Sequence, residues 1–111
     1  MRWILLLATA TALAAEDAWY RVTVLTPEQS TGIYDYYGRL SEGELARLRR
    51  KEMFELRDLR AWNEDHWVPW ATYDPTATGR ILINGDRVLV AMPITGDPIA
   101  VSASAAVQAT P

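Results

Sequence analysis

The stretch Ser41–Trp62, SEGELARLRRKEMFELRDLRAW, combines a helix start signal with a sustained spacing of leucines. Ser41 and Glu44 form a capping-box pattern, in which the serine hydroxyl accepts the backbone N–H of the glutamate. The leucines that follow recur at helical spacing and form one apolar stripe: Leu45, Leu48, Leu56 and Leu59. The stretch therefore predicts one long helix over about 41–62.

Two side chains do not fit the amphipathic pattern of that predicted helix. Glu52 falls inside the leucine arc, which makes it a candidate buried acid with a raised pKa. We favour the simpler interpretation that Arg49 pairs with it at the edge of the stripe. Phe54 falls on the opposite face and predicts a second contact, either with the C-terminal part of the chain or with a partner.

The sequence before the long helix predicts a strand and a first helix. Trp19–Leu25 is rich in β-branched and aromatic residues and alternates with a period of two, as a half-buried strand does. Thr26 and Pro27 then provide a cap and a first helical residue, which predicts a helix from Pro27 to about Tyr37. Gly38 is placed to stop it.

The sequence after the long helix predicts a β-hairpin and a tail. Asn84-Gly85 lies between two apolar, β-rich runs and predicts a type I′ turn joining strands 80–83 and 86–92. Both runs are continuously apolar, so we expect both faces of the hairpin to be covered. The Ala/Ser-rich end, 98–111, carries no charge and predicts a flexible tail.

These elements predict a small single α+β domain over 15–97. Its order is a strand, two helices and a hairpin, with an antiparallel sheet packed on the helices. Half of the 111 residues are apolar, which is enough for one modest core.

An aromatic segment, 62–73, provides the candidate binding residues. It holds three of the five tryptophans, Trp62, Trp67 and Trp70, together with Tyr73. Exposed rings of this kind can stack on sugars, which suggests a carbohydrate- or peptidoglycan-binding platform. Rings that cover the core of a small domain without disulfides are the competing interpretation, and the one that we favour.

The same segment contains weak metal-ligand candidates, Glu64, Asp65 and His66. A contiguous run cannot easily direct several side chains at one ion, and no second His or Cys completes a transition-metal site. We therefore predict no metal site and no cofactor.

Composition and motifs narrow the function classes. The formal net charge of −3 gives no global field for nucleic acid, and the absence of cysteine excludes disulfides and a thiolate nucleophile. With one His, no G-x-S-x-G pattern and no phosphate loop, we predict no catalytic residues and no enzyme activity.

The N-terminal sequence resembles a secretory signal. Arg2 precedes an apolar run, and Ala12-Leu13-Ala14 is a cleavage pattern, so we expect 1–14 to be removed. The apolar run is too short for a stable transmembrane anchor. The alternative is that the segment is retained in a fold or an assembly. Export without cysteine predicts a periplasmic or secreted protein.

Three functional hypotheses follow. The first is an exported, non-enzymatic binding domain of the bacterial cell envelope, with a protein or a glycan of the envelope as partner. The second is a carbohydrate- or peptidoglycan-binding module that uses the tryptophans of 62–73. The third is a structural component of an envelope or virion assembly. Oligomeric state does not follow from the sequence.

Overall fold

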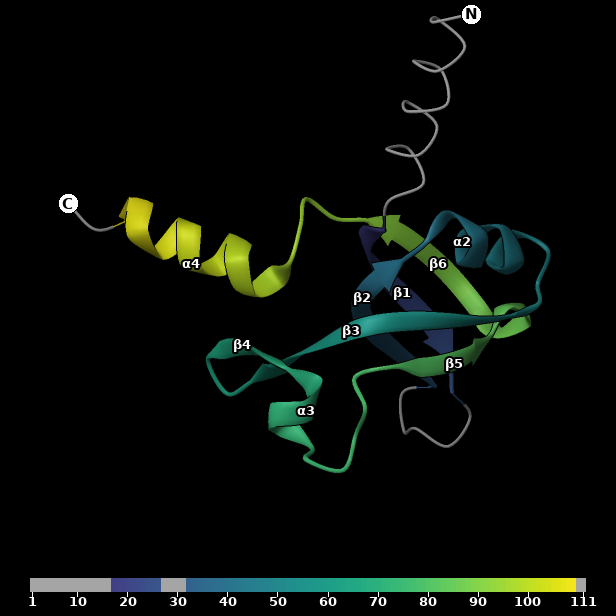
Figure 1. Ribbon diagram of the computed structural model, residues 1–111, viewed down its shortest axis with the longest axis horizontal. Coiled ribbons are helices and arrows are strands. Elements are labelled where there is room, and N and C mark those ends of the chain that lie inside the picture. Colours follow the sequence, from purple (N-terminus) through teal and green to yellow (C-terminus); the bar gives the residue numbers. More distant parts are fainter. Residues whose placement is uncertain (1–16, 27–31, 110–111) are drawn as a thin grey trace, which may run out of the picture.

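The computed structural model describes residues 17–26 and 32–109, so the expected leader over 1–14 lies outside the described residues. Within them, an antiparallel sheet of six strands is accompanied by three α-helices (Figure 1). In chain order the elements are β1 (Ala18–Leu25), β2 (Ile33–Leu40), α2 (Glu42–Arg49), β3 (Met53–Asn63), β4 (His66–Pro69), α3 (Trp70–Tyr73), β5 (Ile81–Asn84), the 3₁₀ turn η1 (Gly85–Arg87), β6 (Val88–Pro93) and α4 (Pro98–Ala109).

The strand order explains how one sheet encloses a core. The path is β4-β3-β2-β1-β6, and β5 pairs with β3 outside this path. β5 and β6 are separated only by η1, yet they pair with β3 and β1 respectively. Because two strands so close in sequence lie against different parts of the sheet, the sheet must curl around its apolar face (Figure 1).

The predicted helix over 41–62 is correct only at its start. Ser41 Oγ accepts the Glu44 N–H at 3.2 Å, as the capping pattern requires, but α2 ends at Arg49. Lys51 has a left-handed φ of 61°, its N–H donates to Leu48 O, and the next N–H donates to Arg47 O. These bonds are a Schellman motif with lysine in the position that glycine usually occupies, so the sequence carried no stop signal.

The second half of the predicted helix is the strand β3. Phe54 and Leu56 alternate inward, and then Asp58, with φ of 52°, adds one residue opposite β2. This β-bulge shifts the alternation by one, so Leu59 and Ala61 also face the core. The bulge therefore places Leu59 three residues after Leu56 on the same face. This spacing is also that of a helix, which is why the leucine pattern wrongly predicted a helix here.

The predicted helix over 27–37 is also wrong where the structure describes it. Ile33–Leu40 is β2, which pairs along its whole length with β1, and 27–31 lie outside the described residues. Three tyrosines in this stretch favour a strand, and the partner strand outweighs the weak helix signal. The predicted strand over Trp19–Leu25 is confirmed, because Val22 and Val24 face the core as expected.

The predicted hairpin turn is wrong as well. β5 and β6 do not pair with each other, and Asn84 caps η1 by accepting the Asp86 N–H at 3.0 Å. Gly85 is required for close approach: its N–H donates to Glu52 O at 3.0 Å, and a Cβ there would lie 2.5 Å from that oxygen.

The core lies inside the curled sheet, and its fully buried side chains are Phe54, Leu40, Leu56 and Val22. The expected α+β class is confirmed as a small single domain with an antiparallel sheet, although it is richer in strand than predicted. α2 is a short helix against β3 rather than one of two long layers. Packing of a sheet on a helical pair is therefore replaced by packing of the sheet on itself.

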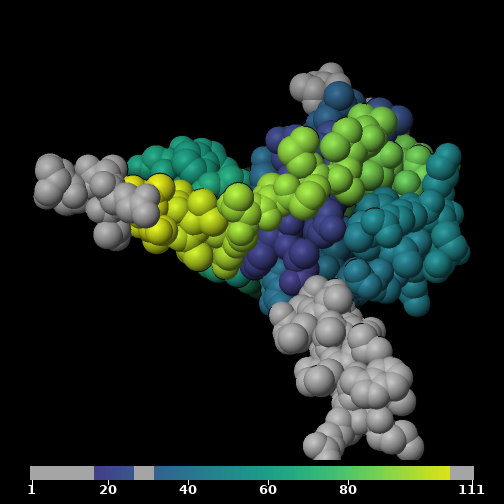
Figure 2. All heavy atoms as spheres, turned by 90° about the horizontal axis from the view of Figure 1, so that it is seen from above, coloured from purple at the N-terminus to yellow at the C-terminus, as the bar shows by residue number. Residues whose placement is uncertain are grey.

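The last described segment is a helix where a flexible tail was predicted. α4 begins at Pro98, where Asp97 Oδ1 accepts the Ile99 N–H at 3.0 Å and caps the first turn. Figure 2 shows α4 extending from the body of the molecule beside the region of β4 and α3. None of the described helices is both long and apolar enough to cross a membrane.

Candidate functional site: an aromatic notch

A notch opens where β2 and β3 separate. Their pairing includes Arg39 with Arg57 and ends at Tyr37 with Arg60, while β3 continues to Asn63 and turns into β4. The β3–β4 hairpin therefore diverges from the first half of β2, and α3 follows directly after it (Figure 1). The space between them is a cavity of about 180 Å³. We call it the aromatic notch, and its lining residues are Tyr34, Asp35, Tyr37, Arg60, Ala61, Trp62, Trp67, Trp70 and Tyr73.

One wall of the notch is a chain of rings in edge-to-face contact. Trp62 and Trp67 are cross-strand partners on β3 and β4, with ring centroids 5.5 Å apart and planes at 73°. Trp67 also meets Tyr37 of β2, at 4.7 Å and 68°. Such tilted pairs are the favoured geometry for aromatic quadrupoles. Because neighbouring planes are far from parallel, these rings form corners rather than a flat platform.

A second group of rings at the notch comes from α3 and the start of β2. Trp70 packs against Tyr73 at 5.9 Å and 67°, and against Tyr36 at 6.1 Å and 43°. Tyr34 lies 4.7 Å from Tyr36. Burial raises the pKa of Tyr34 and of Tyr36 above the usual phenol value, and neighbouring phenols raise that of Tyr34 further. Both phenols are therefore neutral at physiological pH.

The structure brings four of the predicted binding residues together in the notch. Trp62 and Tyr73 are 54% and 57% exposed, whereas Trp67 and Trp70 are half-buried. The fifth, Phe54, is 0% exposed and pairs across β3 and β5 with Ile83. Phe54 is therefore a core residue, and no second face exists for it, because it lies on a strand in the same core cluster as Leu56 and Leu59.

The two charged residues that line the notch, Arg60 and Asp35, have different kinds of bonding partner. Arg60 makes a two-point ion pair with Asp97, with Nε–Oδ1 at 3.0 Å and Nη2–Oδ2 at 3.1 Å, and its guanidinium lies 5.1 Å from the centre of the Trp19 ring. Arg60 thus presents its stem to the notch and its charge to β1 and the start of α4. Asp35 is exposed, and its carboxylate accepts a hydrogen bond from the Thr23 hydroxyl at 2.6 Å.

The Arg60–Asp97 pair also perturbs the carboxyl group. The hydrogen bonds from the Arg60 guanidinium lower the pKa of Asp97 below its usual value, and the Ile99 N–H contributes in the same direction. Both effects stabilise the charged carboxylate. Asp97 is consequently a fixed anion that joins β3 to the start of α4.

An apolar groove adjoins the notch. It lies between α4 and the sheet, has a volume of about 310 Å³, and shares Tyr37 and Trp67 with the notch. Its other lining residues are Ile94, Thr95, Gly96, Pro98, Val101, Ser102 and Ala105. Because Tyr37 and Trp67 line both, notch and groove form one continuous surface, in which the aromatic rings adjoin the smaller side chains of the groove.

Glu52 is not a buried acid. It lies at the surface after α2 and accepts hydrogen bonds from Arg50, at 2.9 and 3.3 Å. Arg50 lowers the pKa of Glu52, which is the opposite of the shift that burial would cause. The prediction failed because Glu52 follows the end of the helix, so the leucine arc that would have enclosed it does not form. The expected pairing with Arg49 is replaced by pairing with Arg50.

The weak metal-ligand candidates lie in the exposed turn between β3 and β4. Asp65 Oδ1 is 2.9 Å from His66 Nδ1, and Glu64 has φ of 60° in the same turn. The residues that the structure describes contain no group of three or more His, Cys, Asp or Glu side chains that could hold a metal ion.

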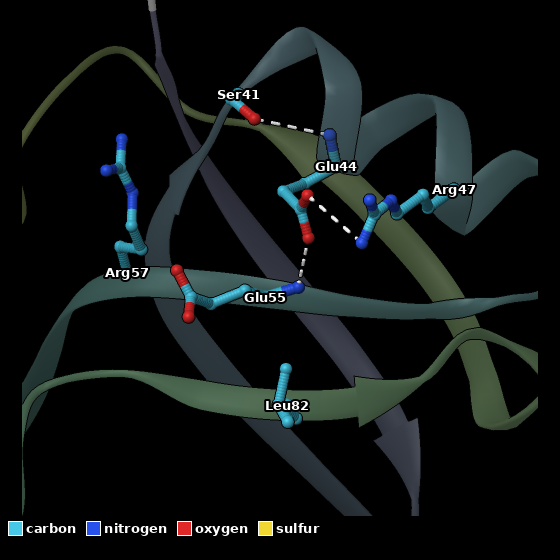
Figure 3. A pocket seen from close by; sticks show the side chains of 6 residues that line it. All are labelled: Ser41, Glu44, Arg47, Glu55, Arg57 and Leu82. Atoms are coloured by element: carbon cyan, nitrogen blue, oxygen red, sulfur yellow. Dashed lines mark hydrogen bonds and ion pairs between the residues drawn. The ribbon is translucent and has the colours of Figure 1, made fainter.

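A separate, polar pocket of about 350 Å³ lies between α2 and β3 (Figure 3). Glu44 occupies its centre, where Oε1 accepts the Glu55 N–H at 2.6 Å and Oε2 lies 3.8 Å from Arg47 (Figure 3). Arg57, on its rim, forms an ion pair with Asp17. The Glu44–Glu55 bond fastens α2 to β3, and the Arg57–Asp17 pair joins β3 to the residue before β1, so we interpret this pocket as a structural joint.

The sequence alone does not bring the residues that β2 contributes to the notch together with the tryptophans of 62–73. The sequence predicts a helix for Tyr34, Asp35 and Tyr37, and it places Arg60 near the end of the long helix. The tyrosines of β2, Tyr34, Tyr36 and Tyr37, favour a strand, and that signal could have placed them beside the tryptophans.

Comparison of the chain with protein-family models, with curated proteins and with solved structures finds no significant match.

Proposed function

We propose that this protein is an exported, non-enzymatic interaction domain of the bacterial cell envelope, and that it binds a protein partner through the aromatic notch and the adjoining groove. The observation that carries the proposal is the gathering of six aromatic side chains from β2, β3, β4 and α3 around one surface cavity. Small soluble domains seldom expose clustered rings without a binding role.

The exposure of individual rings supports a protein ligand. Trp62 and Tyr73 each leave more than half of their surface in water, and both lie on the rim of a cavity rather than singly on the surface. Trp and Tyr are the residues that most often dominate the binding energy of protein interfaces. The groove extends this surface toward α4, so a partner could contact a larger area than the notch alone provides.

Export is motivated by the sequence of 1–14, with its basic start, apolar run and Ala12-Leu13-Ala14 pattern. Absence of cysteine is compatible with an oxidising compartment but does not require one. Cell fractionation, followed by mass spectrometry of the N-terminus, tests this part. We expect the protein in the periplasm or medium, beginning at Ala15. An intact Met1 would favour the alternative in which the segment is retained in an envelope or virion assembly.

A carbohydrate ligand is the second candidate, because Trp62 and Tyr73 expose ring surface on which a sugar could stack. The ring angles argue against a flat platform, since Trp62 and Trp67 stand at 73° and Trp70 and Tyr73 at 67°. Peptidoglycan pull-down with the purified protein separates the candidates. Sedimentation with the glycan that depends on Trp62 would favour sugar over protein.

The partner itself is sought by affinity capture from envelope extract with the full chain, carrying a C-terminal tag. We expect a protein that is captured by the wild type and lost with the double variant Trp62→Ala, Tyr73→Ala. Leu82→Ala, Leu89→Ala is the matched control, because both leucines are exposed, at 66% and 53%, and neither lines the notch. Capture that survives the notch variant, or that fails equally with the control, would contradict the proposal.

A further inference from the structure

We propose that the aromatic notch receives the cationic side chain, arginine or lysine, of the partner protein, held between ring faces and the Asp35 carboxylate. The inference rests on the proposed function and specifies the group that the partner inserts. It follows from three properties of the notch: the placement of its rings, its size and the charge of Asp35.

Aromatic rings line the cavity from several elements of the fold. Trp62 and Trp67 come from the β3–β4 hairpin, Tyr37 from β2, and Trp70 and Tyr73 from α3. Neighbouring planes stand at 67–73° within the pairs Trp62–Trp67, Tyr37–Trp67 and Trp70–Tyr73. The face of an aromatic ring carries negative quadrupole potential, so rings that wall a corner attract a cation placed between them.

The size of the notch restricts what can enter. Its volume of about 180 Å³ is below the ~300–1,000 Å³ of pockets that enclose a drug-sized ligand. It is suited to a single side chain rather than to a cofactor or an oligosaccharide. A partner would therefore anchor one residue here and spread its remaining contacts over the groove.

The charge of the notch selects the sign of that residue. Arg60 and Asp35 are the charged residues among its lining, and the Arg60 guanidinium is already neutralised by its two bonds to Asp97. The Asp35 carboxylate accepts its hydrogen bond from a neutral hydroxyl, and no ion pair joins it to a cation among the described residues. An anionic ligand would meet π-rich rings and a carboxylate, whereas a cation would be attracted by both kinds of group.

The test is a nuclear magnetic resonance titration of the full-length protein with small amides. The probes are N-acetyl-arginine amide, N-acetyl-lysine amide, choline, and N-acetyl-citrulline amide, which has the shape of arginine without its charge. We expect arginine and lysine amides to shift the resonances of the notch tryptophans. Citrulline amide should bind about five- to tenfold more weakly, the size of a partly exposed cation–π and charge contribution.

A pair of variants tests the role of Asp35. Asp35→Asn should weaken the arginine amide about fivefold and leave the citrulline amide unchanged. Asp86→Asn is the matched control, because it removes the same charge at a site away from the notch. Asp86 lies in η1, where the Gly85 N–H bonds Glu52 O just before β3 begins, whereas the notch lies at the other end of β3. Equal weakening by both variants would mean general electrostatic attraction and would overturn the assignment.

Other outcomes also decide against the inference. Equal binding of arginine and citrulline amides would make the notch a neutral apolar pocket, and the absence of any shift would mean that it holds no such group. Tighter binding of choline than of arginine amide would indicate a free quaternary ammonium ligand in place of a partner's side chain.

The inference and the proposed function can fail separately. Capture of a partner that depends on Trp62 and Tyr73, but is insensitive to Asp35→Asn and to arginine amide, would keep the interaction domain and remove the cationic anchor. Binding of the amides at the notch without any notch-dependent partner would do the reverse.

Discussion

Trp62 and Trp67 face each other across the β3–β4 hairpin, with ring centroids 5.5 Å apart and planes at 73°. Two indoles in such tilted contact couple electronically, so the far-ultraviolet circular dichroism should contain an exciton couplet. We expect Trp62→Phe and Trp67→Phe each to abolish it. Trp19→Phe should preserve it, because Trp19 packs against Arg39 and Arg60 instead. A couplet that survives Trp62→Phe would contradict the described geometry of the hairpin.

Lys51→Gly should stabilise the protein. Lys51 holds φ of 61°, a conformation that costs an L-residue about 1–2 kcal/mol and that glycine adopts freely. Part of this gain is offset by the greater freedom of glycine in the unfolded chain, so we expect about 1 kcal/mol in urea unfolding. Arg50→Gly is the control: its φ of −89° gives glycine no advantage, and it should destabilise. Stabilisation by both changes, or by neither, would count against the Schellman end of α2.

Gly85→Ala should destabilise by about 1–3 kcal/mol, because the new Cβ would lie 2.5 Å from Glu52 O and 3.0 Å from Lys51 C, which are backbone atoms. Gly43→Ala is the matched control within α2. The nearest atom to its Cβ would be Ser41 Oγ at 3.9 Å, so we expect a gain of up to about 1 kcal/mol from helix propensity. Thermal unfolding of the two variants measures the difference. If Gly85→Ala were neutral, the close contact of η1 with the end of α2 would be wrong.

The Arg60–Asp97 pair predicts a specific pH dependence. The folded-state pKa of Asp97 is lowered, so its contribution to stability is fully present above the unfolded value of about 3.9 and is lost as pH falls through the folded value. Asp97→Asn should therefore be less stable than wild type at pH 7, and the two should converge as the pH falls below about 4. Glu52→Gln removes an exposed pair with Arg50 and should change stability little. A constant difference between Asp97→Asn and wild type at all pH values would assign the effect to packing.

The sequence by itself determined the local features whose partners lie nearby. Ser41 began α2, the alternation of 19–25 made β1, and the apolar runs around Asn84 became β5 and β6. Clustering of Trp62, Trp67, Trp70 and Tyr73 in 62–73 was visible before any fold was known. Each of these rests on caps, side-chain periodicity or composition within about ten residues, which the linear chain expresses directly.

Tertiary structure decided where the chain leaves those local rules. A lysine took the left-handed position that ends α2, and the bulge at Asp58 turned a strand's period of two into the three-residue step of a helix. Pairing of β5 with β3 and of β6 with β1 replaced the hairpin, and separation of β2 from β3 opened the notch beside Asp35. These choices depend on strands that are distant in sequence, because an extended strand gains its hydrogen bonds and burial only from its neighbours.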